Sequence, residues 1–180
     1  DAMLKRMKRG AGKGRIIELL QKMRNAPDSF IRTSFIVGHP NESDAEFEEL
    51  LDFMRDFDFD RVNIFAYSDE EDTAAYAMDE KIDTKTINKR IKRLDKLVQA
   101  KTQKSLQARV GKEVLIVIEG SSSEHELFMG ARELLWAPTI DGEILVNESD
   151  IEGVCIGGCY RAIISECAGD KLIATITHVA

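Results

Sequence analysis

Residues 30–67 read FIRTSFIVGHPNESDAEFEELLDFMRDFDFDRVNIFAY. The pattern predicts one strand at 30–37 and a second strand at 61–67. Between them, Ser43 and Glu46 form the capping box S-x-x-E that opens a helix, and apolar residues follow at helical spacing. A strand–helix–strand order predicts two parallel strands joined by a right-handed crossover, so this part of the chain is of the α/β class.

Three further helices are predicted around this unit. Residues 2–9 form a short basic helix, and residues 15–24 form a second helix with one apolar face. A long helix at 84–109 has one apolar stripe and many lysines and arginines on its other faces. Such a basic face could bind nucleic acid, although a solvated helix face is the commoner meaning of the pattern.

Two strands are too few for a stable α/β sheet. We therefore expect that earlier strands of the same sheet are missing from this chain. The strand at 30–37 would then be an exposed edge, through which the isolated chain is expected to self-associate.

The character of the chain changes after residue 112. Five short strands separated by turns rich in glycine and serine predict a small antiparallel β-barrel, similar in size to an OB-fold. The predicted domains are residues 1–110, which include the long basic helix, and residues 112–180.

The charge of the chain is unevenly distributed. The net charge is −7 overall, but residues 112–180 hold four basic and twelve acidic residues, so this part carries −8 and the remainder +1. An acidic barrel should repel nucleic-acid phosphates and attract a basic partner. An acidic surface that serves only solubility explains the count equally well.

Composition also restricts the class of protein. No apolar run reaches the roughly 20 residues that a membrane span needs, and the first ten residues do not resemble a signal peptide. Cys155, Cys159 and Cys167 are an odd set, which favours a reducing, cytoplasmic compartment. Their spacing fits neither a zinc site nor an iron–sulfur site, so we interpret them as small core or turn residues and predict no metal.

The end of the second strand is the candidate ligand edge. Residues 62–73 read VNIFAYSDEEDT, in which an apolar strand runs into polar and acidic residues. Open α/β folds bind ligands at the carboxyl ends of their strands. The alternative is a core strand followed by a solvated turn. Arg32 shares a strand face with Ser34 and Ile36, and it could either hold a carboxylate or be an ordinary surface arginine.

A hairpin at 127–147 contains Trp136, the only tryptophan, next to acidic residues. It could be an aromatic anchor inside the barrel or a docking patch for another protein.

Together these motifs resemble the C-terminal half of the radical S-adenosylmethionine methylthiotransferases. The stretches that carry the resemblance are MLKRMKRG (3–10), IRTSFIVGHPNES (31–43), FDRVNIFAYSDEEDTAA (59–75) and GARELLWAPTIDGEILV (130–146). The acidic run after Ser68 and the APTIDG turn resemble the branch that modifies a ribosomal protein more than the branch that modifies tRNA. The chain departs from the usual pattern of the family at His39, Asn41, Ser43 and Asp72.

The resemblance implies a fold and a reaction. Residues 1–110 would be the C-terminal portion of a radical SAM partial (βα) barrel, and residues 112–180 a TRAM domain. The full-length enzyme would use S-adenosyl-L-methionine and two 4Fe–4S clusters to add a methylthio group to the β-carbon of an aspartate in the twelfth protein of the small ribosomal subunit. No C-x3-C-x2-C motif occurs in this chain. We therefore expect it to bind none of these cofactors and to be inactive alone.

The resemblance also implies two sets of site residues. Those expected to line the cofactor are Arg32, Ile36, Val37, Gly38, Phe65, Ala66, Tyr67 and Ser68. Those expected to dock the basic ribosomal protein are Asp69, Glu70, Glu71, Trp136, Asp141 and Glu143. The alternatives are a relative that modifies tRNA and a non-catalytic acidic binding module; nucleic acid is not expected on the acidic barrel.

Overall fold

The computed structural model describes residues 1–27 and 29–180. It divides into two compact units, residues 1–101 and residues 102–180, and each is described here by itself. The division falls inside the long helix, ahead of the predicted position near residue 111. The last part of that helix, residues 102–107, belongs to the second unit, as does Arg109, whose Nε lies 2.5 Å from a carboxylate oxygen of Glu133.

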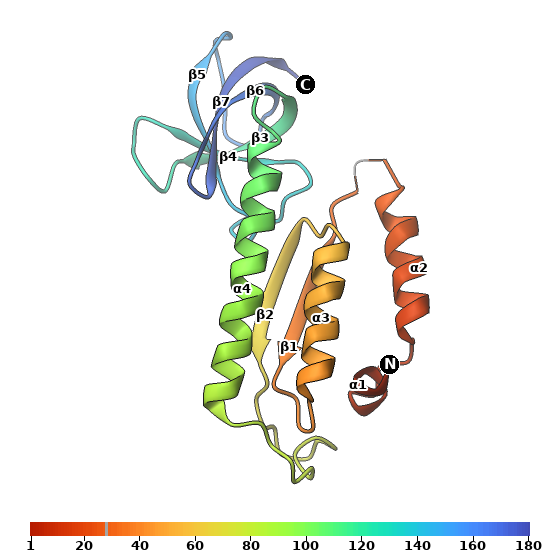
Figure 1. Ribbon diagram of the computed structural model, residues 1–180. Helices are drawn as coiled ribbons and strands as arrows, with labels where there is room; N and C mark the ends of the chain where they lie inside the picture. The colour runs from red at the N-terminus through yellow and green to blue at the C-terminus, as the bar shows by residue number, and fades with distance from the viewer. Residues whose placement is uncertain (28) are drawn as a thin grey trace. The chain divides into compact units, whose positions relative to one another are not determined.

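The first unit is a two-stranded parallel sheet with helices (Figure 1). Its elements in chain order are α1 (Ala2–Arg6), α2 (Lys13–Arg24), β1 (Arg32–Val37), α3 (Asp44–Asp56), β2 (Arg61–Ala66) and the greater part of α4 (Thr84–Gln107). Strands β1 and β2 pair in parallel, as the sequence pattern predicts, and Ile36 is the register partner of Phe65.

The predicted capping box starts α3. The Ser43 hydroxyl accepts a hydrogen bond from the Glu46 backbone N–H at 3.2 Å, and the Glu46 carboxylate accepts one from the Ser43 N–H at 3.0 Å. Two backbone donors that the first helical turn leaves without partners are thereby satisfied. This fixes where the chain turns from β1 into α3.

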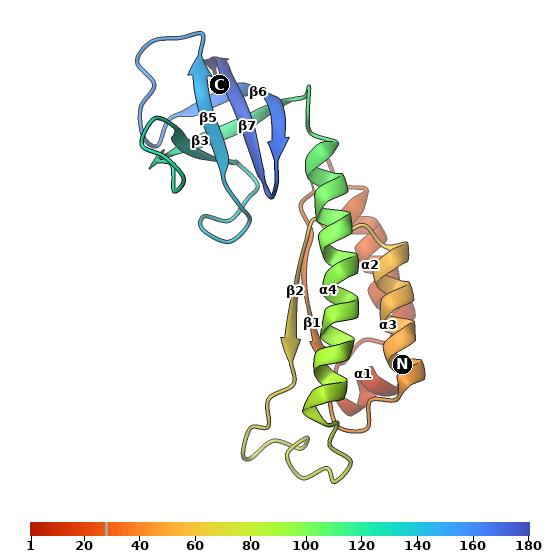
Figure 2. The same ribbon diagram turned by 60° about the vertical axis from the view of Figure 1, so that its left-hand side comes forward.

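The core of the first unit lies between the sheet and its helices. Its buried members are Ile31, Val37, Phe47, Leu51, Met54, Phe59 and Leu94. Phe35, Val62 and Ile64 pack against this cluster from the sheet. Figure 2 shows α3 and α4 on the same side of the two strands. The opposite face of the sheet carries Arg32, Ser34, Ile36, Arg61, Asn63 and Phe65, and it is more exposed. We call these six residues the open face.

The second unit is a closed five-stranded barrel. Its strands are β3 (Glu113–Ser121), β4 (Met129–Glu133), β5 (Ile144–Ser149), β6 (Cys159–Ala168) and β7 (Lys171–Val179), in the order β3-β4-β5-β7-β6. The five strands confirm the predicted barrel. The prediction of a wholly antiparallel barrel needs one correction, because β5 and β7 pair in parallel. After β5 the chain forms β6, which is antiparallel to β7. The turn between β6 and β7 reverses the chain, so β7 runs in the same direction as β5.

Alternating residues of the strands fill the barrel, including Ile116, Ile118, Ile144, Ile164, Leu172 and Ile176. Among the described residues, no helix is both long enough and apolar enough to cross a membrane.

Candidate functional site

The turn after β1 is buried and closely packed. Gly38 has a φ of +88°, and a Cβ atom added there would lie 2.4 Å from the Ile87 Cγ1 atom of α4. The Gly38 N–H donates a hydrogen bond to the Glu42 carboxylate at 3.2 Å, and the side chains of His39 and Glu42 are themselves buried. The backbone of this turn therefore approaches α4 as closely as only a glycine permits.

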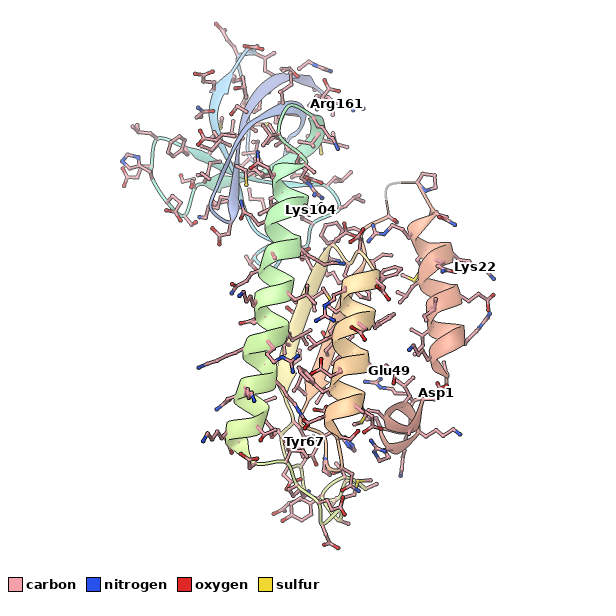
Figure 3. The ribbon with its side chains drawn as sticks, in the orientation of Figure 1. Asp1, Lys22, Glu49, Tyr67, Lys104 and Arg161 are labelled. Carbon is pink, nitrogen blue, oxygen red and sulfur yellow. The ribbon has the colours of Figure 1, made fainter. Side chains whose placement is uncertain are left out.

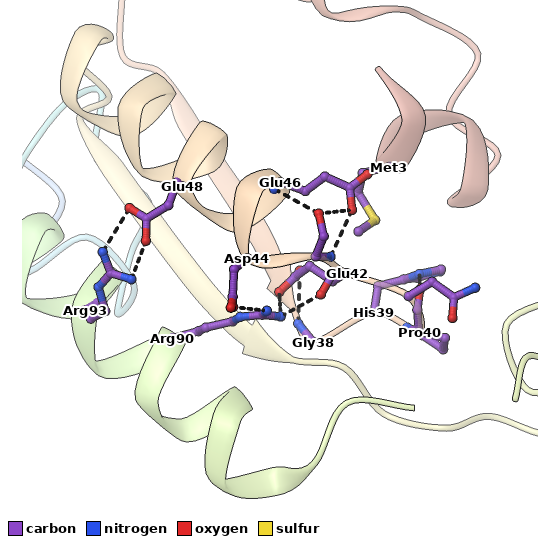
Figure 4. A network of polar contacts seen from close by, with 12 residues as sticks. Met3, Gly38, His39, Pro40, Glu42, Asp44, Glu46, Glu48, Arg90 and Arg93 are labelled. Carbon is purple, nitrogen blue, oxygen red and sulfur yellow. Dashed lines mark hydrogen bonds and ion pairs between the residues drawn. The ribbon is translucent and has the colours of Figure 1, made fainter. Parts of the chain in front are cut away.

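A buried arginine joins this turn to α4 (Figure 4). The Arg90 guanidinium lies 2.6 Å from the Glu42 carboxylate and 2.7 Å from the Asp44 carboxylate, and it donates a further bond to the Glu42 carbonyl. Burial raises the pKa of Glu42 above its ordinary value, although the Gly38 N–H and Arg90 oppose the rise. The hydrogen bond from Arg90 lowers the pKa of Asp44. The cluster holds the end of β1 in place.

Replacing Glu42 by glutamine is expected to change how stability depends on pH. The pKa of Glu42 is higher in the folded chain than its ordinary value of 4.5, so its contribution to stability is complete below 4.5. That contribution is lost as the pH rises through the raised pKa. The difference in free energy of unfolding, wild type minus Glu42→Gln, should therefore fall as the pH rises from about 4 to 7. Urea titrations at several pH values measure it, and a difference that grows with pH contradicts the expectation.

Tyr67 continues the parallel pairing beyond the end of β2, because its N–H donates to the Val37 carbonyl at 2.8 Å. Its hydroxyl donates a hydrogen bond to the Asp69 carboxylate, and its ring meets the His39 ring edge-on at 5.4 Å. Burial of the ring, together with the hydrogen bond to Asp69, raises the pKa of Tyr67 to about 12. Tyr67 is therefore a neutral donor near pH 7. Figure 3 shows it beside the start of α4.

Lys81 organises the acidic loop that follows. Its ammonium group forms an ion pair with Asp69 and donates hydrogen bonds to the carbonyl oxygens of Ala75 and Tyr76, at 2.9 and 3.1 Å. The Asn41 N–H also bonds to the Glu80 carbonyl at 2.8 Å, which ties this loop to the turn after β1. The loop at the carboxyl end of β2 is thus held in a defined shape.

The predicted cofactor residues divide into three groups. Arg32, Ile36 and Phe65 lie together on the open face, and Phe65 is 54% exposed. Val37 and Gly38 are buried beneath the helices instead and can reach a ligand only through their backbone. Ala66 and Ser68 are exposed at the end of β2, and Tyr67 is half-buried there. The Arg32 guanidinium lies 4.7 Å from the centre of the Phe30 ring, which gives it an aromatic contact.

The sequence did not predict a cavity along β1. It has a volume of about 550 Å³, and α1, α2, β1 and α3 line it. Ser34 and Ile36 of the open face reach it, together with apolar residues such as Leu4, Met7 and Leu20. The sequence pattern predicted the helices at 2–9 and 15–24, but no sequence signal indicated the space between them and β1.

The predicted docking residues are less accessible than expected. Trp136 and Asp141 are buried, so they shape the turn rather than offer their side chains to a partner. The Asp141 carboxylate accepts a hydrogen bond from the Ala137 N–H at 2.6 Å, and Arg109 lies 5.9 Å from the Trp136 ring centre. Exposed apolar side chains surround that turn instead: Leu134, Leu135 and Ile140.

The acidic docking residues differ in how they are held. Glu143 forms hydrogen bonds with Ser123 and Lys171, which lower its pKa although burial raises it. Asp69 is bound by Lys81, and Glu70 accepts a hydrogen bond from the Ser68 hydroxyl at 2.8 Å. Glu71 is exposed. The acidic loop therefore offers Glu70 and Glu71 more readily than Asp69.

The cysteines do not lie in the core. Cys155 and Cys159 are exposed on the turn before and at the start of β6, and Cys167 is half-buried. Cys155 is a turn residue, as interpreted from the sequence, because the Gly158 N–H donates a hydrogen bond to the Cys155 carbonyl at 3.1 Å. Within residues 1–27 and 29–180, no three Cys, His, Asp or Glu residues are grouped so as to hold a metal ion.

Comparison with known proteins finds matches both to the barrel and to the chain as a whole. The family model of the TRAM domain matches residues 110–177, which contain the barrel. The chain is 52% identical over 99% of its length to the ribosomal protein uS12 methylthiotransferase RimO of Wolinella succinogenes, and 50% identical over 98% to that of Nitratiruptor sp.. The protein of the same name from Sulfurimonas denitrificans is 51% identical over the whole chain. The chain spans about two fifths of the length of these relatives, 40%, 40% and 41%.

Proposed function

We propose a function from one premise: this chain belongs to the ribosomal protein uS12 methylthiotransferase family and matches its C-terminal part. The protein that contains the chain would replace a hydrogen on the β-carbon of an aspartate in uS12 by a methylthio group. It would do so in the cytoplasm, where uS12 is made. The observation that carries the proposal is identity of 50 to 52% over almost every residue of the chain.

The first unit is proposed to be the last part of a radical SAM partial barrel. S-adenosyl-L-methionine and 4Fe–4S clusters would supply the radical that removes the hydrogen. The open face fits one wall of an adenosine site, because Ile36 and Phe65 are adjacent and apolar while Ser34 and Asn63 offer hydrogen bonds. The same unit has no cysteine, so its residues do not fit a cluster, whose ligands would come from other parts of the protein.

The residues of this chain would position the substrates and enclose the site. They would not themselves transfer atoms. The Arg90 cluster would fix the turn after β1, so that the backbone near Gly38 borders the site. Lys81 would hold the acidic loop at the same edge, where Glu70 and Glu71 would meet a basic segment of uS12. The TRAM domain, with its net charge of −8, would add long-range attraction for that basic protein.

A chimera tests the proposed function. This chain replaces the matching C-terminal part of the Wolinella succinogenes relative, to which it is 52% identical. With S-adenosylmethionine, a reductant and a sulfide source, we expect mass spectrometry to find the methylthio group on uS12. The 180 residues alone should give no product. Modification of tRNA instead of uS12, or no activity in a chimera with its clusters assembled, contradicts the proposal.

The same chimera separates docking from chemistry. Glu70→Gln with Glu71→Gln should raise the KM for uS12 several-fold and leave kcat nearly unchanged, because only charge attraction is lost. Glu148→Gln with Glu152→Gln removes equal charge from the barrel and is the matched control. If the KM for uS12 rises equally in both variants, docking depends on the overall charge of the chain rather than on the acidic loop.

A further inference from the structure

Helix α4 carries a row of lysines on one side. Lys85, Lys89, Lys92 and Lys96 follow one another at spacings of four, three and four residues, and all are exposed. At 3.6 residues per turn they fall within about 60° of the helix circumference, and at 1.5 Å per residue they extend over about 16 Å. We call these four residues the lysine row.

The lysine row is distinct from the basic residues of α4 that serve the fold. Arg90 binds Glu42 and Asp44, Arg93 binds Glu48 at 2.5 Å, and Lys101 binds Asp58 at 3.0 Å. These partners hold α4 against the helix and turns beside it. Within residues 1–27 and 29–180 the ammonium groups of the lysine row form no ion pair or hydrogen bond, and only the charge of Lys89 acts at a distance on Asp44, whose pKa it helps to lower. Asp95 is the only acidic residue of α4.

The row lies opposite the face of α4 that packs on the core, because its four lysines are exposed, whereas Ile87 and Leu94 on the other side of the helix are buried. Figures 1 and 2 show α3 and the sheet beside α4. Four like charges about 5 Å apart along the axis repel one another, so their alignment by itself costs the fold stability. A linear polyanion with regularly spaced charges would relieve that repulsion, and a nucleic-acid backbone is such a polyanion.

We propose that the lysine row binds the phosphate backbone of double-stranded RNA. The row presents its charges along a line, and a duplex presents its backbone phosphates at regular intervals. Helix α4 has no aromatic residue on which unpaired bases could stack, which disfavours a single strand. Contacts from lysine ammonium groups to phosphates carry no sequence information, so we expect the contact to be independent of sequence. The proposal rests on α4 alone and does not depend on the proposed methylthiotransferase function.

Binding of the 180-residue chain to a fluorescein-labelled RNA duplex of arbitrary sequence tests the proposal. Fluorescence anisotropy is measured between about 50 and 200 mM salt. Wild type is compared with Lys85→Gln, Lys89→Gln, Lys92→Gln and Lys96→Gln combined. The matched control combines Lys5→Gln, Lys8→Gln, Lys104→Gln and Lys112→Gln, four exposed lysines outside the row.

The row variant should bind at least about tenfold more weakly at the lowest salt, and the slope of log K against log salt should shrink by about 3. The control should lose less than about threefold. Circular dichroism verifies that both variants fold. Equal losses in the two variants, or no binding by wild type at low salt, would overturn the proposal. Tighter binding of the row to anionic lipid vesicles or to polyglutamate than to the duplex would overturn it as well.

Discussion

Replacing Arg90 by methionine is expected to destabilise the first unit by about 3–5 kcal/mol, because it leaves a buried carboxylate without its partner. The side chains of Arg90 and Glu42 are only 6% and 5% exposed, and the pair lies inside the packing between α4 and the turn after β1. Methionine preserves much of the volume of arginine, so the loss reports the missing charge rather than a cavity. The amides of β1, protected by pairing with β2, report the effect through native-state hydrogen exchange.

Two further variants test whether the burial of the Arg90–Glu42 pair causes this loss of stability. Arg93→Met removes an exposed arginine whose ion pair with Glu48 has comparable distances, and it should cost about 1 kcal/mol or less. Adding Glu42→Gln to Arg90→Met should recover part of the loss, since the unpaired buried charge is then gone. If Arg93→Met costs as much as Arg90→Met, burial is not the source of the effect.

Replacing Gly38 by alanine should cost a similar amount for a different reason. The left-handed backbone at φ +88° costs an alanine about 1–2 kcal/mol. The added methyl would also lie 2.4 and 2.5 Å from two carbon atoms of Ile87, and such overpacking costs about 1–3 kcal/mol. A total of about 2–5 kcal/mol follows, measured by the same exchange of β1 amides.

The two parts of that loss can be separated. Gly14→Ala lies inside α2 with open space around its Cβ position, and it should stabilise the chain by about 0.5–1 kcal/mol. Gly38→Ala combined with Ile87→Ala should cost less than the sum of the single variants, because the smaller side chain makes room for the methyl. Simple additivity would show that the backbone angle alone is responsible.

The sequence predicted local structure well because local signals determine it. The capping box of Ser43 and Glu46, the parallel pair of strands and the five barrel strands all follow from spacing and turn residues. The parallel pairing of β5 with β7 was not predicted, because it depends on the path that the chain takes between them. Turn residues show where a strand ends but not which strand becomes its neighbour.

The site was harder to predict because burial is a tertiary property. In the sequence Arg90 is one of many basic residues of a long helix, yet it alone meets Glu42, 48 positions away, in the core. Trp136 and Asp141 resembled a docking patch for the same reason: a loop rich in exposed residue types can still fold inward. The open face was predictable in part, because strand alternation places Arg32 and Ile36 on the same side.

The position of β7 in the barrel has a consequence for protein synthesis. Strand β7 supplies both its antiparallel pairing with β6 and its parallel pairing with β5, so the barrel cannot close until residues 171–179 have left the ribosome. Before that, one edge of β5 is unpaired, and such an edge invites association with other chains. The β6–β7 hairpin forms from neighbouring residues and can fold as soon as it emerges. The nascent barrel therefore remains open along one edge of β5 until β7, the last strand to be synthesised, pairs with that edge.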